Sequence, residues 1–286
     1  MSAKREPVTK RGPPGREMIP DQAVMTAFVK RVGRPAAERA TAAAQQFMYD
    51  AWEANSLPKA LASVHKALRT SPLCSDAIVF LASSLAASPE DEVELYERAF
   101  AAAGLALNPK DFEEMQGHFW GFVETRPYMR ARHLLALAQI KAGRHSEAVE
   151  HCGEMLRLNP NDNQGIRYIM LDELLRLGCV DEAAALIKRY RGDEAAHWLY
   201  GAALLAFRTK GDTVVTRRTL AKALVQNAHA PAYLLGRKRL PKNPPAFVGW
   251  GDHSEAVAYA QDSGVLWRDC PGALDWLARA ADRGGK

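Results

Sequence analysis

The chain has 286 residues, of which 48% are hydrophobic and 25% are charged, values that are typical of a soluble protein. No apolar segment follows Met1, and apolar runs such as Ala202–Phe207 are far shorter than a membrane span, which argues against secretion and membrane insertion. The formal net charge of +5 lies mainly in residues 1–16, where five basic residues oppose only Glu6. Alanine-rich segments with few β-branched runs predict an all-α fold, and we expect a cytoplasmic location.

Residues 1–17 combine these basic side chains with prolines and glycines, a composition that predicts a disordered tail. A basic tail can contact nucleic acid or anionic lipid, but a solubilising end is the simpler interpretation. After Pro20 we expect a short helix with Asp21 as its N-cap. Its apolar face is predicted to contain Val24, Phe28 and Val32.

The first recognisable helix pair is predicted to consist of a helix from Pro35 to about residue 54, followed by Pro58–Thr70. A second pair is predicted over residues 77–87 and 89–107, where Pro89 and three carboxylates make a helix start. Residues 110–126 are interpreted as an additional helical segment with four aromatic side chains, Phe112, Phe119, Trp120 and Phe122. These rings form either an exposed contact patch or, as we favour, an inward-facing contact between repeats.

A six-residue segment repeats in the centre of the chain. Gly143–Ala148 (Gly-Arg-His-Ser-Glu-Ala) is matched 35 residues later by Gly178–Ala183 (Gly-Cys-Val-Asp-Glu-Ala), and each copy lies between two apolar helical runs. A helix, a glycine-containing turn and a second helix at a period near 34 residues are typical of tetratricopeptide repeats. Such pairs stack because one pair cannot bury its apolar faces alone.

A further pair is predicted over Glu194–Thr209 and Thr213–Ala228. The six-residue motif then returns as Gly251–Ala256, where Asp252 and Glu255 have the spacing of a capping box, and a last helix is predicted after Pro271. We therefore expect a tetratricopeptide-like α-α superhelix, a right-handed solenoid of antiparallel helix pairs, over residues 18–230. Residues 231–286 are predicted to close it as a C-terminal helical cap.

Motifs for chemistry are absent from the sequence. It contains no phosphate-binding glycine loop, no nucleophile elbow and no zinc-protease motif, and no two histidines are four apart on one helix. The 4 cysteines are scattered without metal-ligand spacing, and Cys152 is interpreted as a reduced, buried thiol. We expect no catalytic residue, no cofactor and no metal.

A stack of helix pairs offers a groove lined by the first helix of each pair. In peptide-binding tetratricopeptide proteins the groove carries a lysine and an asparagine four residues apart; the corresponding residues here are His133 with Leu137 and Tyr168 with Asp172. Capture of a terminal carboxylate is therefore not predicted. Together with Arg130 and Arg167, these residues suit recognition of a mixed polar peptide, or they are ordinary surface residues.

The C-terminal third carries a more specific pattern. Pro231–Gly236 (Pro-Ala-Tyr-Leu-Leu-Gly) is followed by a proline-rich segment, by Gly251–Ala260, by Trp267 and by Gly272–Leu274. Over about residues 231–277 this resembles the suppressor of tumorigenicity 7 family, whose soluble part is also tetratricopeptide-like. The resemblance implies a shared C-terminal module and supplies no catalytic residues. Animal members carry N-terminal membrane segments that this sequence lacks, so their membrane location is not expected here.

Two interpretations of this block remain open. The favoured one is a cap, in which Tyr233, Leu234 and Leu235 cover the last apolar face of the stack. The other is a site for an acidic peptide or phosphate, where basic residues meet Trp250 and His253. Its basic residues are Arg237, Lys238, Arg239 and Lys242.

The favoured function is a non-enzymatic scaffold that binds a protein or peptide partner. The alternative is a factor associated with nucleic acid or ribonucleoprotein, which would use the basic tail and residues 237–242. An enzyme with a site in the C-terminal module is a third hypothesis.

Overall fold

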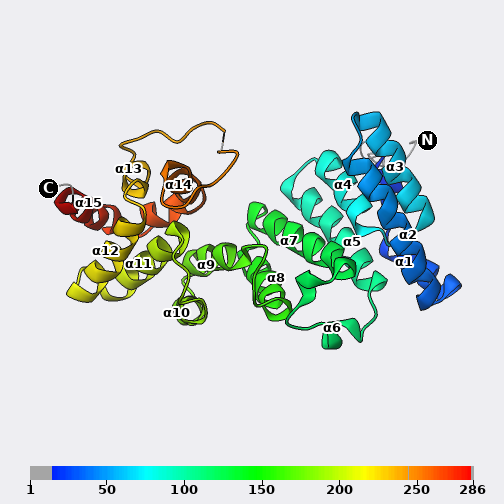
Figure 1. Ribbon diagram of the computed structural model, residues 1–286, viewed down its shortest axis with the longest axis horizontal. Coiled ribbons are helices and arrows are strands. Elements are labelled where there is room, and N and C mark those ends of the chain that lie inside the picture. Colours follow the sequence, from blue (N-terminus) through cyan, green and yellow to red (C-terminus); the bar gives the residue numbers. More distant parts are fainter. Residues whose placement is uncertain (1–14, 244, 285–286) are drawn as a thin grey trace, which may run out of the picture. The chain divides into compact units, whose positions relative to one another are not determined.

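In the computed structural model of the chain, residues 15–243 and 245–284 are described. All regular structure in these residues is helical, which confirms the all-α prediction for them (Figure 1). The predicted tail lies outside the described residues except for 15–17. There, Arg16 begins a short 3₁₀ helix, η1 (Arg16–Met18), and its guanidinium forms ion pairs with Asp91 and Glu94.

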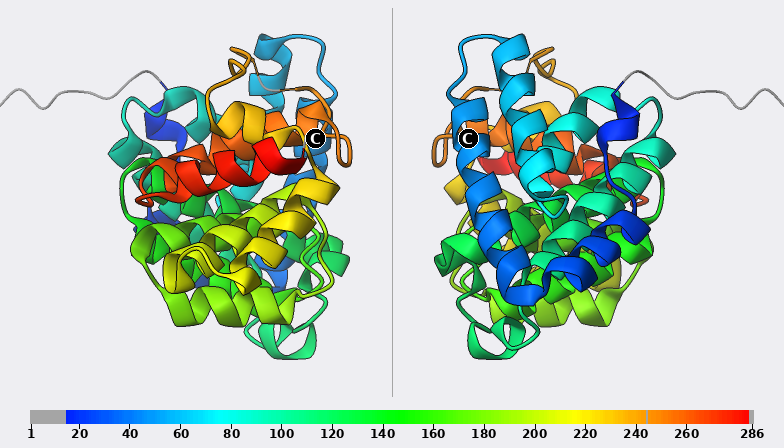
Figure 2. Two further views of the ribbon diagram at one scale, coloured as in Figure 1. Left: turned by 90° about the vertical axis from the view of Figure 1, so that its left-hand side faces the viewer. Right: turned by 90° about the vertical axis from the view of Figure 1, so that its right-hand side faces the viewer.

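The chain divides into two compact units, residues 1–164 and 165–286. In the first unit, consecutive helices pack as antiparallel pairs, α2 with α3, α4 with α5 and α7 with α8; α2 and α3 lie side by side in Figure 2. The helices of this unit are α1 (Gln22–Val32), α2 (Arg34–Trp52), α3 (Leu57–Thr70), α4 (Ser75–Leu85), α5 (Pro89–Ala106), α6 (Asp111–Glu114), η2 (Phe119–Gly121), η3 (Val123–Thr125), α7 (Arg126–Lys141) and α8 (His145–Leu158).

Helix α1 begins as the sequence predicts but buries only part of the predicted face. The Asp21 carboxylate accepts a hydrogen bond from the Val24 amide at 2.8 Å, which is the predicted N-cap. The predicted apolar face is correct only for Phe28, which packs against the core, because Val24 is 52% exposed and the fully buried residue is Met25. The buried face is set by contacts with α2, the next helix, and with α5, which lies far along the chain.

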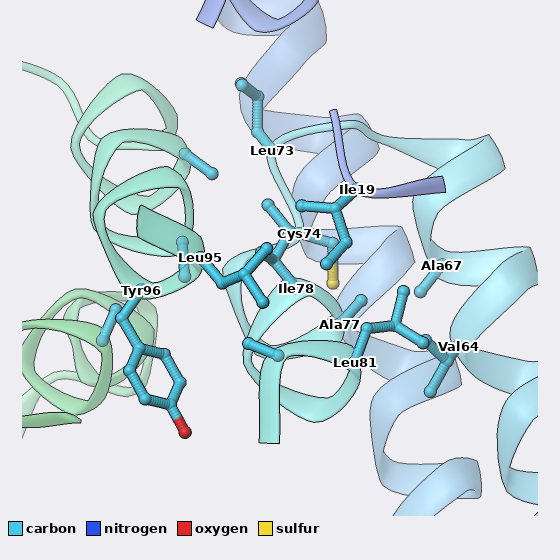
Figure 3. Packing of buried hydrophobic residues seen from close by; sticks show 14 of the residues in the cluster. Ile19, Val64, Ala67, Leu73, Cys74, Ala77, Ile78, Leu81, Leu95 and Tyr96 are labelled. Carbon is cyan, nitrogen blue, oxygen red and sulfur yellow. The ribbon is translucent and has the colours of Figure 1, made fainter. Parts of the chain in front are cut away.

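The core of the first unit is centred on α4. This helix packs against α3, α5 and α7, which explains why it is apolar on nearly all sides. Figure 3 shows Ile78 beside Leu95 and Leu81 beside Val64. The thiol of Cys74 is part of this core, and burial raises its pKa to about 12.

The segment 110–126, predicted to be helical, is helical only in short pieces. It forms α6 and two short 3₁₀ helices, because Gly117 adopts a positive φ of 91° and interrupts the helical path. The inward packing is confirmed for Phe119, which is fully buried with ring centroids 5.3 Å from Phe112 and 5.7 Å from Tyr128. Phe122 remains exposed.

The second unit is built around α11, which packs against α9, α12, α14 and α15. Its core is aromatic: Trp267 donates a hydrogen bond to the Tyr259 hydroxyl at 2.7 Å, and its ring stacks with Trp276. The helices of this unit are α9 (Ile166–Leu177), α10 (Val180–Arg189), α11 (Ala196–Lys210), α12 (Val214–Gln226), α13 (Ala230–Leu234), α14 (His253–Arg268) and α15 (Ala273–Gly284). Helices α13–α15 thus belong to the same compact unit as α9–α12, and their role as a cap stays a prediction.

The glycine that opens each copy of the six-residue motif has a conformational function. Gly143, Gly178 and Gly251 all have positive φ values, of 75°, 75° and 71°. Residues with a Cβ atom rarely adopt this conformation, so the turn before the next helix requires glycine. The recurrence of the motif therefore reflects the same backbone geometry in three turns.

Candidate functional site

The first unit contains a groove of about 530 Å³ next to α2 and the start of α7. We call it the α2–α7 groove; its lining includes Glu38, Arg39, Ala42, Tyr49, Leu107, Asp111, Met115, Val123 and Glu124. The apolar members come from α2, from the end of α5 and from the segment between α6 and α7. Three carboxylates oppose one guanidinium in this lining, so the groove has acidic character.

Arg130, a predicted contact residue, is held beside this surface by a buried carboxylate. Its guanidinium pairs with Asp76 of α4, which is only 2% exposed and also accepts a hydrogen bond from Gln45 of α2 at 2.8 Å. The guanidinium also lies 5.7 Å from the ring centroid of Trp52. These contacts join α2, α4 and α7, which gives Arg130 a structural role, while Trp52 stays exposed.

His133 and Leu137, the predicted pair on α7, are both half-buried and do not line the groove. Burial lowers the pKa of His133 below its ordinary value. At a neutral pH this side chain is therefore uncharged, which does not suit capture of a carboxylate.

The second unit contains an aromatic pocket of about 310 Å³. We call it the Tyr168–Trp250 pocket; its lining is Tyr168, Ala195, His197, Val248, Gly249, Trp250, Glu255, Ala258 and Tyr259. Tyr168 and Trp250 were singled out in the sequence for separate reasons, and the structure brings them together here. Trp250 is 66% exposed, so the pocket has an accessible aromatic edge.

Arg167 and Tyr168 are both attached to Asp193. The guanidinium donates to the Asp193 carboxylate at 2.6 Å, and the Tyr168 hydroxyl donates to the same oxygen at 2.8 Å. Arg167 also lies 4.5 Å from the centroid of the Tyr168 ring. Burial and the Asp193 carboxylate raise the pKa of Tyr168 to about 12, so the hydroxyl stays protonated.

Behind the pocket, Asp172, His197 and Ser263 form a polar cluster that joins α9, α11 and α14. His197 Nε2 lies 3.0 Å from Asp172, and Ser263 Oγ donates to Asp172 at 2.6 Å. Burial opposes protonation of His197, but the Asp172 carboxylate outweighs it, and the pKa is raised. The cluster is not a nucleophilic triad, because Ser263 is buried and its hydroxyl proton points to the carboxylate.

Glu255, in the third copy of the motif, accepts hydrogen bonds from several parts of the second unit. Its donors are the Ala196 amide, the Gly251 amide and the Asn227 side chain, at 2.9, 2.8 and 2.9 Å. The predicted capping box is therefore only half correct. Asp252 does cap α14 through the amides of Ser254 and Glu255, but Glu255 binds other donors instead of the amide of Asp252.

The basic segment after α13 does not assemble with both Trp250 and His253 into one pocket. Arg237 pairs with Asp282 at 2.7 Å, and Arg239 is exposed. His253 stacks on His229 with ring centroids 3.8 Å apart. Of these residues, only Trp250 lines the Tyr168–Trp250 pocket.

Residues 15–243 and 245–284 contain no group of three histidine, cysteine or acidic side chains that could share a metal ion. The helices in these same ranges are too short or too polar to cross a bilayer.

Comparison with known proteins identifies the family. The family model described as ST7 protein matches residues 36–282. The chain belongs to the ST7 protein family. The family match extends over most of the chain and corrects the prediction that specific resemblance is confined to residues 231–277.

The ST7 relatives are distant in sequence and longer than this chain. A human protein named suppressor of tumorigenicity 7 protein-like is 27% identical over 252 residues, which are 80% of this chain and 44% of that protein. The Drosophila melanogaster protein ST7 homolog is 25% identical over 257 residues, which are 81% of this chain and 47% of that protein. The chain thus spans about half the length of the curated relatives that it matches.

Proposed function

We propose that the chain is a non-enzymatic scaffold that binds a peptide segment of a partner protein in the α2–α7 groove. In this proposal the helix pairs are tetratricopeptide-like and stack as a right-handed solenoid, and α2, the end of α5 and the segment that leads into α7 provide the binding face. The observation that carries the proposal is the groove itself, where the exposed side chains of Tyr49 and Val123 adjoin an apolar floor.

The groove favours a peptide with apolar and basic residues. Leu107 and Met115 offer an apolar floor, and the carboxylates of Glu38, Asp111 and Glu124 are in the lining. Opposite charges at the rim steer a partner and fix its register, while apolar side chains supply most of the affinity. The same carboxylates disfavour nucleic acid at this surface, because phosphates would meet like charge.

Peptide selection from a random library tests the proposal. We expect the selected peptides to carry lysine or arginine beside large apolar residues. The double variant Tyr49→Ser/Val123→Ser should weaken their binding at least about tenfold, because it removes two apolar contacts without changing the charge of the groove. Both side chains are exposed, so the substitutions should leave the fold intact.

The matched control is Val215→Ser, which changes an exposed valine of α12 in the second unit. Binding that is unaffected by the groove variant, or selected peptides without a common charge, would contradict the proposal. A steep loss of affinity with salt for oligonucleotides, without peptide binding, would support the nucleic-acid alternative.

A further inference from the structure

Residues 235–243 and 245–252, between α13 and α14, form a loop that combines exposed apolar and basic side chains. In Figure 1 it arches away from the helices of its own unit. Phe247 is 88% exposed, Trp250 is 66% exposed and Val248 is 58% exposed. Leu240 is exposed as well. A large aromatic ring exposed to this degree on a loop lowers solubility, so it indicates a surface that is covered in use.

Apart from Asp252, which caps α14, the charged residues of the loop are all basic. Residues 235–251 contain four basic residues and no aspartate or glutamate. Arg237 is occupied by Asp282, and the Lys238 ammonium lies 5.9 Å from the ring centroid of Tyr233. Arg239 and Lys242 are exposed and form no ion pair with any residue that the structure describes. Their positive charge is available to an external anion.

The base of the loop is anchored. The Gly249 amide donates to Ser254 Oγ at 2.8 Å, the Gly251 amide donates to Glu255, and the Gln261 side chain donates to the carbonyl of Pro241. These bonds, together with the prolines, restrict the conformations available to the loop. Binding of a partner then costs less conformational entropy than it would if the loop were unattached to the helices.

We propose that this loop binds the surface of an anionic phospholipid bilayer. Phe247, Val248 and Trp250 enter the region of the head groups and upper acyl chains, where tryptophan and phenylalanine are favoured. Arg239 and Lys242 neutralise lipid phosphates and carboxylates, which attract basic segments next to a membrane. The mode is adsorption to the surface and involves no membrane-spanning segment. It uses a different surface from the α2–α7 groove and does not depend on the peptide proposal.

The composition of the loop favours lipid over the other anionic partners. Single-stranded nucleic acid stacks on aromatic rings, but it gives no comparable contact to the aliphatic side chains Leu240 and Val248. An acidic peptide could pair with Arg239 and Lys242, but it would leave the Phe247 ring uncovered, because that ring is 88% exposed and lines neither the Tyr168–Trp250 pocket nor the α2–α7 groove. A bilayer accommodates aliphatic, aromatic and basic side chains together.

Vesicle co-sedimentation with the full chain tests the proposal. We expect binding to vesicles of phosphatidylcholine and phosphatidylserine in equal proportion, and little binding to phosphatidylcholine alone. Phe247→Ser/Trp250→Ser should weaken binding roughly tenfold or more, since two apolar side chains no longer enter the interface. Arg239→Gln/Lys242→Gln should weaken it about 25-fold, because each basic residue near an anionic surface contributes a factor of about five.

Matched controls come from α12 of the same unit. Val225→Ser changes an equally exposed apolar residue, and Arg218→Gln/Lys222→Gln removes two exposed basic residues. Both controls should bind vesicles like the unaltered chain. Absence of binding to the mixed vesicles, equal binding to neutral vesicles, or equal losses in loop and control variants would each overturn the proposal. So would binding of a single-stranded oligonucleotide or an acidic peptide through the loop without vesicle binding.

Discussion

Glu255 holds the position that Glu147 and Glu182 hold in the two earlier copies of the six-residue motif, but its surroundings differ. Glu147 and Glu182 are exposed, whereas Glu255 is 7% exposed and accepts hydrogen bonds from backbone amides and side-chain amides. A carboxylate that satisfies several buried donors stabilises the fold chiefly because its loss leaves those donors without partners.

We therefore predict that Glu255→Ala lowers the free energy of unfolding by roughly 2–4 kcal/mol, because the amides of Ala196 and Gly251 and the Asn227 side chain lose their acceptor. Denaturant unfolding measures the change. Glu182→Ala is the matched control and should stay within about 0.5 kcal/mol of the unaltered chain. Equal effects of the two variants would show that the hydrogen bonds of Glu255 contribute nothing to stability.

A second prediction at this scale concerns pH. Burial and the positive charge of Arg132 lower the pKa of His151 from 6.5 to about 4. Between these two values the unfolded chain binds a proton that the folded chain does not. The contribution of His151 to the free energy of unfolding is therefore fully retained above pH 6.5, and it is lost as the pH falls towards 4.

The measurement is the free energy of unfolding against pH between 6.5 and 4. His151→Phe keeps an aromatic ring beside Phe100, whose ring centroid is 5.4 Å from that of His151. Because the variant has no ionisable group at this position, its free energy of unfolding should decrease less steeply as the pH falls. His118→Gln replaces an exposed histidine and should leave the decline unchanged. An unchanged slope in His151→Phe would contradict the burial of the neutral ring.

The sequence predicts some of these residue roles and not others, for a physical reason. A glycine in a turn and Asp252 as an N-cap are determined by neighbours within a few residues, and both predictions are confirmed. The role of Glu255 depends on donors up to 59 residues away, and the buried face of α1 depends on α5. Neither can be deduced from local spacing.

At the scale of elements, the first unit is joined by a charged contact across three helices. Asp76 of α4 is buried between Gln45 of α2 and Arg130 of α7. Such a contact fixes how the helices are aligned, since a shift of any one helix would leave the carboxylate without its partners.

We predict that Arg130→Met lowers the free energy of unfolding by about 2–3 kcal/mol. This is somewhat less than the loss for a fully buried ion pair, because the arginine is partly exposed. Lys141→Met is the control on the same helix. It removes the Lys141–Glu92 pair at the surface and should cost no more than about 1 kcal/mol. Thermal or denaturant unfolding compares the two, and a larger loss for the Lys141 variant would contradict the proposed importance of Asp76.

Most helices are predictable because their apolar residues recur at helical spacing and their ends carry proline, glycine or capping residues. The segment 110–126 shows where this approach fails. Its aromatic residues have helical spacing, but Gly117 turns the chain and its amide donates to the Leu158 carbonyl of α8 at 2.8 Å. Similarly, the Tyr168–Trp250 pocket joins residues whose proximity arises from packing between α9, α11 and the loop before α14.

At the scale of the molecule, the chain consists of two units, each with a core of its own. The first is centred on the aliphatic cluster around Ile78, and the second on the aromatic contacts of Trp267 and Trp276. We predict that residues 15–164 and 165–284, expressed separately, each fold into a helical domain with cooperative thermal unfolding. Circular dichroism measures this, and a non-cooperative transition in either fragment would contradict it.

The family match covers more of the chain than the stretch in which short motifs are recognisable. Residues 231–277 contain clustered proline, glycine and tryptophan, which make a recognisable pattern within a single stretch. The relatives are only 25–27% identical to the chain over the whole match. In the helical pairs before residue 231 the sequence shows mainly apolar residues at helical spacing, a pattern that many helical families share.

The distribution of the cysteines has a practical consequence for labelling chemistry. Cys74, Cys152 and Cys270 are buried, whereas Cys179 is partly exposed at the turn between α9 and α10. Burial also raises the pKa of Cys74 and of Cys270, so little reactive thiolate forms at either. A maleimide reagent should therefore modify the folded, unaltered chain at Cys179 first. A spectroscopic probe can thus be attached beside the second copy of the six-residue motif without any substitution.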